Sequence, residues 1–255
     1  CMMAERYAVA TGLWTAATFN GGTLPAAGDT VHANGYTVTV DQDITVAALS
    51  TRVGVTAAAG GGFTVSSAGR TVRANLYSGT TSCLTCSASS GTFTHYGWSH
   101  GSNTTAGVYA RVYALRNTGA GLVVAYGHAF GDVGHGINVS STGHLYLYGD
   151  AVGGIAYNCA GIHASGSSSG HGYVFGTARS HATGLGPGAY GSSSGTSCVI
   201  VQAAEQGAGG GWHSQGKVLF NDFNNIAFGV RNAANTLKTI GVLPHSSFST
   251  PRAFT

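Results

Sequence analysis

The chain has 255 residues and a net charge of +3, and only 7% of its residues are charged. Its 42 glycines exclude a mainly helical protein, because glycine costs about 1 kcal/mol at each helix-interior position. A hydrophobic fraction of 43% excludes disorder, and four prolines without a three-residue glycine period exclude collagen. The composition therefore predicts an all-β chain that is rich in turns.

Residues 1–75 are predicted to form an N-terminal cap and the first coils of the fold. The runs 38–40 and 44–46 alternate apolar and polar residues, as half-buried strands do. A stack of strands needs its open edge covered, which gives this region its predicted role as a cap. The chain starts Cys1-Met2-Met3 and carries no apolar segment typical of a secretory signal. A mature chain starting with Cys would fit a bacterial lipoprotein, and this alternative stays open.

A two-part repeat runs through residues 76–241, the predicted body of the fold. Its first part is a short apolar strand that ends in glycine, or in Gln202 and Asn221 in weaker copies, at intervals of 19 to 30 residues. Its second part reads glycine, apolar, polar, small. The first part recurs at 94–97, 124–127, 147–149, 174–176, 200–202, 219–221 and 239–241, and the second at 107–110, 136–139, 161–164, 188–191, 211–214 and 229–232.

Two elements in fixed order predict a right-handed parallel β-helix, or β-solenoid, with irregular coils of about 19–30 residues. Strand alternation places the apolar residue of the second part inside and its polar neighbour in solvent. The predicted interior column is Val108, Ile137, Ile162, Ala189, Trp212 and Val230, and the predicted solvent column is Tyr109, Asn138, His163, Tyr190, His213 and Arg231. Residues 242–255 are predicted to be a C-terminal tail.

Carboxylates are the first candidates for chemistry, because glycan cleavage uses paired acids. Asp41 and Asp43 lie two apart in a strand pattern, which predicts side chains on one face about 7 Å apart. That spacing would suit an inverting hydrolase, and turn capping is the alternative. A second candidate is a polar column on one outer face. This column could be a catalytic groove or an ordinary solvent-facing surface, and both interpretations stay open. Its members are His128, Asp150, Thr177 and Asp222.

Histidines and cysteines are the other candidates. The pairs His144/His171 and His163/His213 occupy equivalent positions, where they could bind a metal or form hydrogen bonds at a surface or interface. An acid-sensitive assembly follows if several are buried between subunits.

The Cys83-x-x-Cys86 spacing lacks the second ligand pair of a zinc site, which leaves small buried thiols or a local disulfide. A GxGxxG match at 186–191 precedes a Ser-rich turn, so nucleotide binding is excluded. We therefore expect no catalytic, cofactor-binding or metal-binding residues.

The segments WTAATFNGGTLP at 14–25, GDTV at 28–31 and GYTVTVD at 35–41 resemble the opening of right-handed parallel β-helix proteins encoded in the structural regions of tailed bacteriophages. The later coils, such as LYGDAVGG at 147–154, are similar to the degenerate repeats of the same proteins. The resemblance implies a virion component of the head decoration, tail, fibre or tailspike type, and several such relatives are trimers. A complete host-recognition fibre is not expected, because the long C-terminal receptor or chaperone domain of one is not recognised in these residues.

The expected function is that of a non-catalytic virion structural protein, assembled in the host cytoplasm, that stabilises or decorates the particle. Its expected partners are capsid or tail proteins, further copies of itself with a trimer favoured, and host surface glycans. Depletion of Lys and Glu is typical of subunit interfaces. Nucleic acid and membrane are not expected, because no Lys/Arg cluster and no apolar span occurs. The alternatives are a tailspike-like glycan-cleaving enzyme and a bacterial surface adhesin.

Overall fold

The computed structural model describes residues 4–16, 18–52, 58, 60–102, 112–154, 159–165, 169–180, 186–191, 198–205, 214–216, 218–220, 228–231 and 237–241. Over these residues the chain is all-β, with no α-helix and one 3₁₀ turn at Asn20–Gly22. Within them, no helix has the length and apolar character that crossing a membrane requires.

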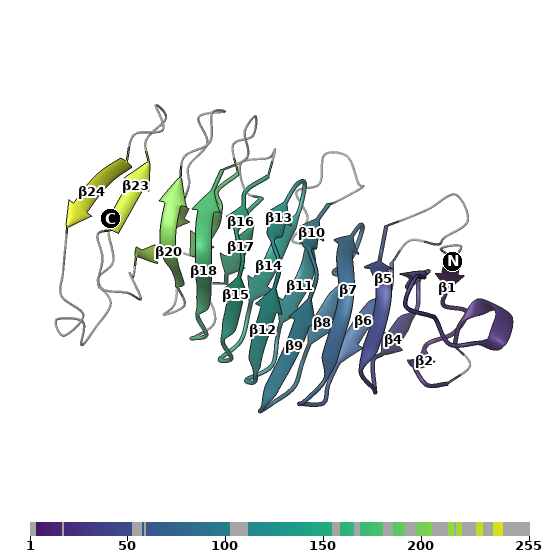
Figure 1. Cartoon of the computed structure of the whole chain (residues 1–255). Helices are drawn as coiled ribbons and strands as arrows, with labels where there is room; N and C mark the ends of the chain where they lie inside the picture. Colours follow the sequence, from purple (N-terminus) through teal and green to yellow (C-terminus); the bar gives the residue numbers. More distant parts are fainter. Residues whose placement is uncertain are drawn as a thin grey trace.

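The predicted β-solenoid is confirmed: the chain winds into coils that stack along one axis, from β1 at one end to β24 at the other (Figure 1). Within the described ranges, strands of successive coils pair in parallel in a 15-stranded and a 9-stranded sheet. Residues paired in parallel lie between 18 positions apart, at Thr30 and Ala48, and 31 positions apart, at Leu84 and Leu115. These steps agree closely with the predicted coil lengths.

The larger sheet bends along the middle of each coil. In the central coils the bend splits the strands into a first row, which precedes a corner glycine, and a second row, which follows it. The first row contains β9 (Thr92–Tyr96), β12 (Leu122–Tyr126), β15 (Leu145–Tyr148) and β22 (Val218–Phe220). The second row contains β10 (Ser99–Gly101), β13 (Ala129–Gly131), β16 (Ala151–Val152) and β23 (Phe228–Arg231). Strands that take part in both rows are β5 (Ile44–Ser50), β7 (Thr71–Ser78), β18 (Gly172–Arg179) and β20 (Val199–Glu205). The sheet begins with β1 (Glu5–Tyr7) and β3 (Thr30–His32).

The smaller sheet closes each coil on its third side. Its strands are β2 (Gly12–Leu13), β4 (Thr37–Thr39), β6 (Gly62–Val65), β8 (Leu84–Cys86), β11 (Tyr113–Asn117), β14 (His135–Val139), β17 (Ile162–Ala164), β19 (Ala189–Gly191) and β21 (Ser214–Gly216). A fully buried column of Leu84, Leu115, Ile137 and Ile162 runs along its inner face. Each such side chain contributes about 1.5–3 kcal/mol by leaving water.

The predicted interior column is partly right. Ile137, Ile162 and Ala189 are paired and buried as expected. Three predicted members are wrong: Leu115 takes the place assigned to Val108, Ser214 takes that of Trp212, and Val230 lies in the larger sheet beside Ala204. Val108 and Trp212 themselves lie outside the described residues. Turns of different length separate the strands, so counting residues from a glycine does not fix the register.

The predicted last coil at 239–241 is also corrected. Strand β24 (Leu237–Gly241) pairs antiparallel with β23, and residues on both strands shift register. Antiparallel pairing needs only a short connection, whereas a further parallel coil needs a full crossover. The predicted tail at 242–255 lies outside the described residues.

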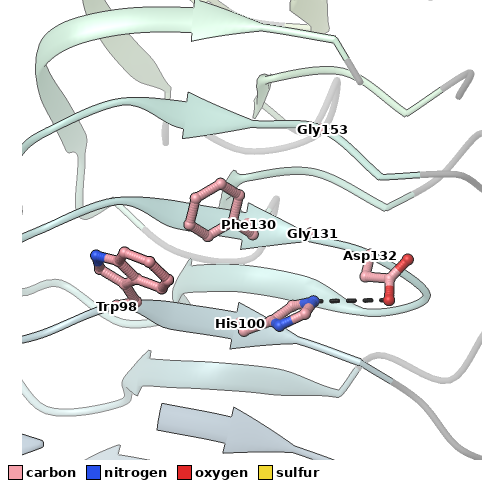
Figure 2. A pocket seen from close by; sticks show the side chains of 6 residues that line it. All are labelled: Trp98, His100, Phe130, Gly131, Asp132 and Gly153. Atoms are coloured by element: carbon pink, nitrogen blue, oxygen red, sulfur yellow. Dashed lines mark ion pairs between the residues drawn. The ribbon is translucent and has the colours of Figure 1, made fainter. Parts of the chain in front are cut away.

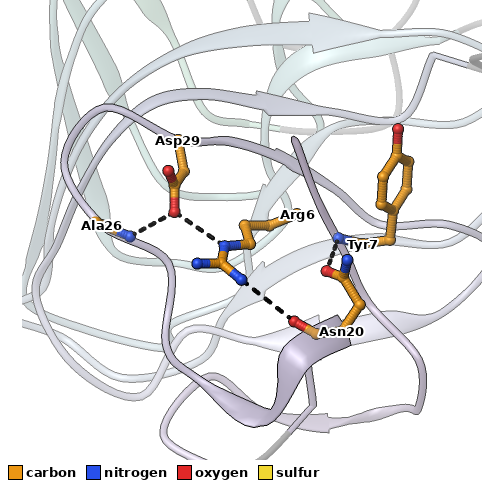
Figure 3. A network of polar contacts seen from close by, with 5 residues as sticks. All are labelled: Arg6, Tyr7, Asn20, Ala26 and Asp29. Carbon is orange, nitrogen blue, oxygen red and sulfur yellow. Dashed lines mark hydrogen bonds and ion pairs between the residues drawn. The ribbon is translucent and has the colours of Figure 1, made fainter. Parts of the chain in front are cut away.

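The N-terminal end of the core is closed by Trp14 and Phe19, which are buried and lie 4.9 Å apart between ring centroids. A polar network fixes this segment (Figure 3). Asp29 accepts hydrogen bonds from the Arg6 Nε, at 3.1 Å, and from the backbone N–H of Ala26, at 2.9 Å. The Asn20 side chain accepts from the backbone N–H of Tyr7 at 2.8 Å. The hydrogen bond from Ala26 and the Arg6 guanidinium hold the pKa of Asp29 below its usual value, despite its burial.

Candidate functional site

Corner glycines divide the outer surface of each central coil into two columns. Gly97 and Gly127 have φ of +138° and +136°. A Cβ atom at these positions would lie 2.1 Å and 2.3 Å from a carbonyl oxygen of the preceding coil. Only glycine fits a corner that is both left-handed and this close to its neighbour. The residue before the glycine therefore belongs to the first row of strands, and the residue after it directly precedes the second row.

The residues before the corner glycines form an aromatic ladder, defined as Tyr96, Tyr126, Tyr148 and Phe175. Successive ring centroids lie 4.9, 5.0 and 4.6 Å apart, and the rings are within 9–14° of parallel. The Arg73 guanidinium covers the outer face of the first ring at 4.0 Å from its centroid. Because the rings cover each other's faces, the ladder presents ring edges and hydroxyl groups to solvent.

The post-glycine column is defined as Trp98, His128, Asp150 and Thr177, which follow corner glycines, together with Asn75, which follows Ala74 at the equivalent place in the preceding coil. Side chains in this column accept hydrogen bonds from the backbone of the next coil. The Asn75 Oδ1 accepts from the Trp98 N–H at 3.0 Å, the His128 Nδ1 from the Asp150 N–H at 3.1 Å, and the Asp150 Oδ1 from the Thr177 N–H at 3.0 Å. The predicted juxtaposition of His128, Asp150 and Thr177 is therefore confirmed, and Asp222 lies outside the described residues.

This column binds coil to coil. The Asp150 Oδ2 lies 3.6 Å from the Arg179 Nη2 and 3.8 Å from the His128 Nδ1. Because that histidine nitrogen accepts a backbone hydrogen bond, it carries no proton to give to a substrate. The Asp150 carboxylate is likewise occupied by a backbone amide and a guanidinium. These contacts are those of a structural bridge.

Trp98 interrupts this pattern. An indole has one N–H donor and no acceptor, so it cannot accept a backbone N–H as Asn75, His128 and Asp150 do. Its side chain projects outward and is 53% exposed. Beside it opens a pocket of about 340 Å³, lined by Trp98, His100, Phe130, Gly131, Asp132 and Gly153 (Figure 2). We refer to it as the Trp98 pocket.

Two polar contacts organise the Trp98 pocket. The His100 Nε2 lies 3.6 Å from the Asp132 Oδ2, and its Nδ1 lies 3.4 Å from the Arg52 Nη2. Since a guanidinium only donates, the Nδ1 is the acceptor and the proton sits on the Nε2, facing Asp132. Burial, together with the nearby Arg52 charge, lowers the pKa of His100, although Asp132 acts in the opposite direction. His100 is therefore neutral at pH 7, and Asp132 is the charged group that lines the pocket.

Histidines elsewhere also bridge coils through the Nδ1 atom. His144 and His171 are stacked with centroids 5.6 Å apart, as their predicted equivalence requires. The His144 Nδ1 accepts from the His171 N–H at 3.2 Å, and the His171 Nδ1 accepts from the Cys198 N–H at 3.3 Å. The His135 Nδ1 accepts from the Ala160 N–H at 3.0 Å. This recurring contact gives a structural reason for a chain with 11 histidines.

The predicted solvent column beside the smaller sheet is wrong for Asn138 and His163, which are both buried. Asn138 Nδ2 lies 3.1 Å from the His163 Nδ1. Rings of four successive coils stack over this face, with 5.3, 4.7 and 4.9 Å between the centroids of Tyr113, His135, His163 and Tyr190. The stack shields polar groups that face outward. His213 lies outside the described residues. The place next to Tyr190 that was predicted for His213 is occupied by Gln215.

Asp41 and Asp43 do not form the predicted pair on one strand face, because both lie in the turn between β4 and β5. Asp41 accepts hydrogen bonds from the backbone and the hydroxyl of Thr15. Burial raises the pKa of Asp41, but these hydrogen bonds outweigh it and leave the pKa lowered. Asp43 accepts from the Thr71 N–H at 2.9 Å. Each aspartate ties its turn to a neighbouring segment, which is the turn-capping alternative.

The Cys83-x-x-Cys86 segment provides buried thiols. Both residues are free and buried in the core, and burial raises the pKa of Cys83 to about 12. A thiol with this pKa is inert at pH 7. The glycine-rich match at 186–191 runs directly into strand β19. Over the part of the chain that the structure describes, three or more His, Cys, Asp or Glu residues nowhere gather as metal ligands would.

The Trp98 pocket was missed at the sequence level, although a signal for it exists. Trp98 follows Gly97, the glycine of the first recognised repeat, so it belongs to the same column as His128 and Asp150. His100 and Phe130 are in register on β10 and β13. Asp132 joins them because its backbone N–H bonds to the Gly101 carbonyl at 2.8 Å. That last contact depends on a turn whose path no periodicity predicts.

Comparison with known proteins gives no relative for this chain: family models, curated proteins and solved structures all yield no match.

Proposed function

We propose that this chain is a non-catalytic structural component of a tailed-bacteriophage virion, as a head decoration or as part of the tail or fibre. The observation that supports the proposal is a parallel β-solenoid whose coils are joined by two sheets and by side-chain bridges in successive coils. Such cross-linking suits a protein that must resist unfolding and proteolysis outside a cell. The resemblance at 14–41 and 147–154 supports the virion setting.

Quantitative mass spectrometry of purified virus particles tests this role directly. The copy number of the chain is measured relative to the major capsid protein. Hundreds of copies per particle are expected for a head decoration or tail sheath, and a handful for a fibre or baseplate component. Absence of the chain from the particles would overturn the proposal.

The glycan-cleaving alternative needs two carboxylates that face one groove. Asp41, Asp43 and Asp150 instead each accept hydrogen bonds from different neighbouring segments. We expect that host capsular polysaccharide incubated with the protein releases no reducing ends above those of a heat-inactivated control. Release that depends on Asp150, tested with Asp150→Asn, would support the enzyme instead.

The expected partners are capsid or tail proteins and further copies of the chain, with a trimer favoured by the resemblance. Native mass spectrometry would then give three times the chain mass of 25.6 kDa. Host surface glycans are proposed to contact the aromatic ladder, where Tyr126 and Tyr148 are 40% and 41% exposed and offer hydroxyl groups. The adhesin alternative predicts a cleaved secretory signal encoded upstream of Cys1 in the full gene.

A further inference from the structure

The Trp98 pocket differs from the rest of the outer surface in how its rings are arranged. The Trp98 and Phe130 rings are inclined at 67° with centroids 6.0 Å apart, and Phe130 and His100 at 65° and 6.1 Å. An edge-to-face contact covers at most one face of the indole. Its large exposed fraction agrees with an open face. The ladder rings, in contrast, cover one another.

The polar groups of the pocket are available as hydrogen-bond acceptors rather than as donors. Asp132, whose side chain is 32% exposed, accepts hydrogen bonds and donates none. Both His100 nitrogens already face partners, the Asp132 carboxylate and the Arg52 guanidinium. Figure 2 shows the indole nitrogen of Trp98 on the side away from Asp132. The pocket therefore offers ring surface, a negative charge and acceptors, but no side-chain donor directed at a ligand.

This combination selects between ligand chemistries. A sugar hydroxyl both donates and accepts hydrogen bonds. In a pocket without side-chain donors, the hydroxyl oxygens of a sugar would therefore have no side chain to accept from. An alkylated ammonium group needs only ring faces and a negative charge, because the ring quadrupole attracts cations. Asp132 supplies the charge. Arg52 lies against the Tyr77 ring and contacts the His100 Nδ1, whereas Asp132 faces the His100 Nε2.

We propose that the Trp98 pocket binds an alkylammonium group, with Trp98 and Phe130 as its walls and Asp132 as its counter-ion. The group belongs to the choline or methylated-amine class, whose apolar surface matches ring walls and whose charge matches one carboxylate. This inference goes beyond the virion role and does not depend on it.

The test uses choline and its uncharged isostere 3,3-dimethylbutan-1-ol, titrated into the 255-residue protein by calorimetry and followed by Trp fluorescence. We expect choline to bind at least about tenfold more tightly than the isostere, because only the cation gains from the rings and the carboxylate. Equal binding of the two compounds would overturn the proposal. So would tighter binding of glucose or N-acetylglucosamine than of choline.

Variants locate the site. Asp132→Asn and Trp98→Leu are each expected to weaken choline binding about tenfold, since the first removes the charge at nearly constant volume and the second removes the ring but keeps an apolar side chain. The matched controls are Asp43→Asn, an exposed aspartate distant in the coil order, and Tyr148→Leu, an exposed ring of the ladder. Asp132→Asn replaces a surface carboxylate and is expected to fold like wild type by circular dichroism. Unchanged choline affinity in this folded variant would refute the assignment.

Discussion

The aromatic ladder and the Trp98 pocket lie on opposite sides of the same corner glycines and use their rings differently. In the ladder, neighbouring rings are within 9–14° of parallel, so each ring covers the next. In the pocket, the rings of Trp98, Phe130 and His100 are inclined by 65–67°. A repeat that places the same ring type in every coil uses ring faces for stability. A column that changes residue type leaves one ring face available to a ligand.

The largest expected effect comes from the corner that separates the two columns. Gly127→Ala would place a Cβ atom 2.3 Å from the Gly97 carbonyl oxygen at a φ of +136°. Backbone strain and overpacking together are expected to lower the free energy of unfolding by about 3–5 kcal/mol, measured by urea denaturation.

Gly28→Ala is the matched control, because a Cβ atom there meets nothing within 4 Å. Its free energy of unfolding is expected to stay within about 0.5 kcal/mol of wild type. A loss below about 1 kcal/mol in Gly127→Ala would contradict the view that the corner requires glycine.

The second effect lies directly behind the ladder, in the core column of the same strands. His95 is fully buried between the paired residues Val72 and Ala125, and its Nε2 contacts the Ala74 carbonyl at 2.9 Å. Burial lowers its pKa from 6.5 to about 4. Between these pH values the unfolded chain binds a proton that the folded chain does not. The contribution of neutral His95 to the free energy of unfolding is therefore fully present above pH 6.5. The free energy of unfolding falls by about 3 kcal/mol as the pH drops to 4.

His95→Leu restores the apolar pattern of this column and removes that proton. We expect the difference in unfolding free energy between pH 7 and pH 4.5, measured in urea, to shrink by about 2 kcal/mol in the variant. Val72→Ala, at the buried residue that pairs with His95 and binds no proton, serves as the control and keeps the wild-type difference. A wild-type pH dependence in His95→Leu would show that His95 titrates normally in the folded protein.

The sequence contained enough information for the fold and for part of the outer surface. Glycine-terminated strands repeat because the left-handed corners at Gly97, Gly127 and Gly149 need glycine, so the coil length and the column from His128 to Thr177 were predicted. The interior residues Ile137 and Ile162 followed from strand alternation. The register failed for Val108 and Trp212, because turns of different length separate the two parts of the repeat.

Burial of outward-facing residues could not be read from alternation. Asn138 and His163 point away from the core, but the stack of rings from Tyr113 to Tyr190 shields them. Stacking joins coils that are about 25 residues apart, as the hydrogen bond from Asn138 to His163 illustrates. The Trp98 pocket needed the same kind of information, since Asp132 reaches His100 from the next coil.

The third prediction compares the ladder with the pocket residue by residue. Tyr126 stacks on Tyr96 and Tyr148, so Tyr126→Ala breaks two parallel contacts and is expected to cost about 1–3 kcal/mol of unfolding free energy. Trp98→Ala removes a larger but half-exposed side chain and is expected to cost less than about 1 kcal/mol. Urea denaturation of both variants gives the order. A larger loss for Trp98→Ala than for Tyr126→Ala would mean that ring inclination does not distinguish rings that stabilise the fold from rings that are available to a ligand.

The smallest effect tests how the ladder ends. Arg73 is paired with Tyr96 between adjacent strands, and its guanidinium lies 4.0 Å from the ring centroid, in the place where another ring would stack. Arg73→Gln is expected to lower the free energy of unfolding by about 0.5–1 kcal/mol. A double-mutant cycle with Tyr96→Leu isolates the contact, because the cost of Arg73→Gln should vanish once the ring is gone. A cost that persists without the ring would place the role of Arg73 elsewhere. The guanidinium would then cover the Tyr96 ring face without stabilising the end of the ladder.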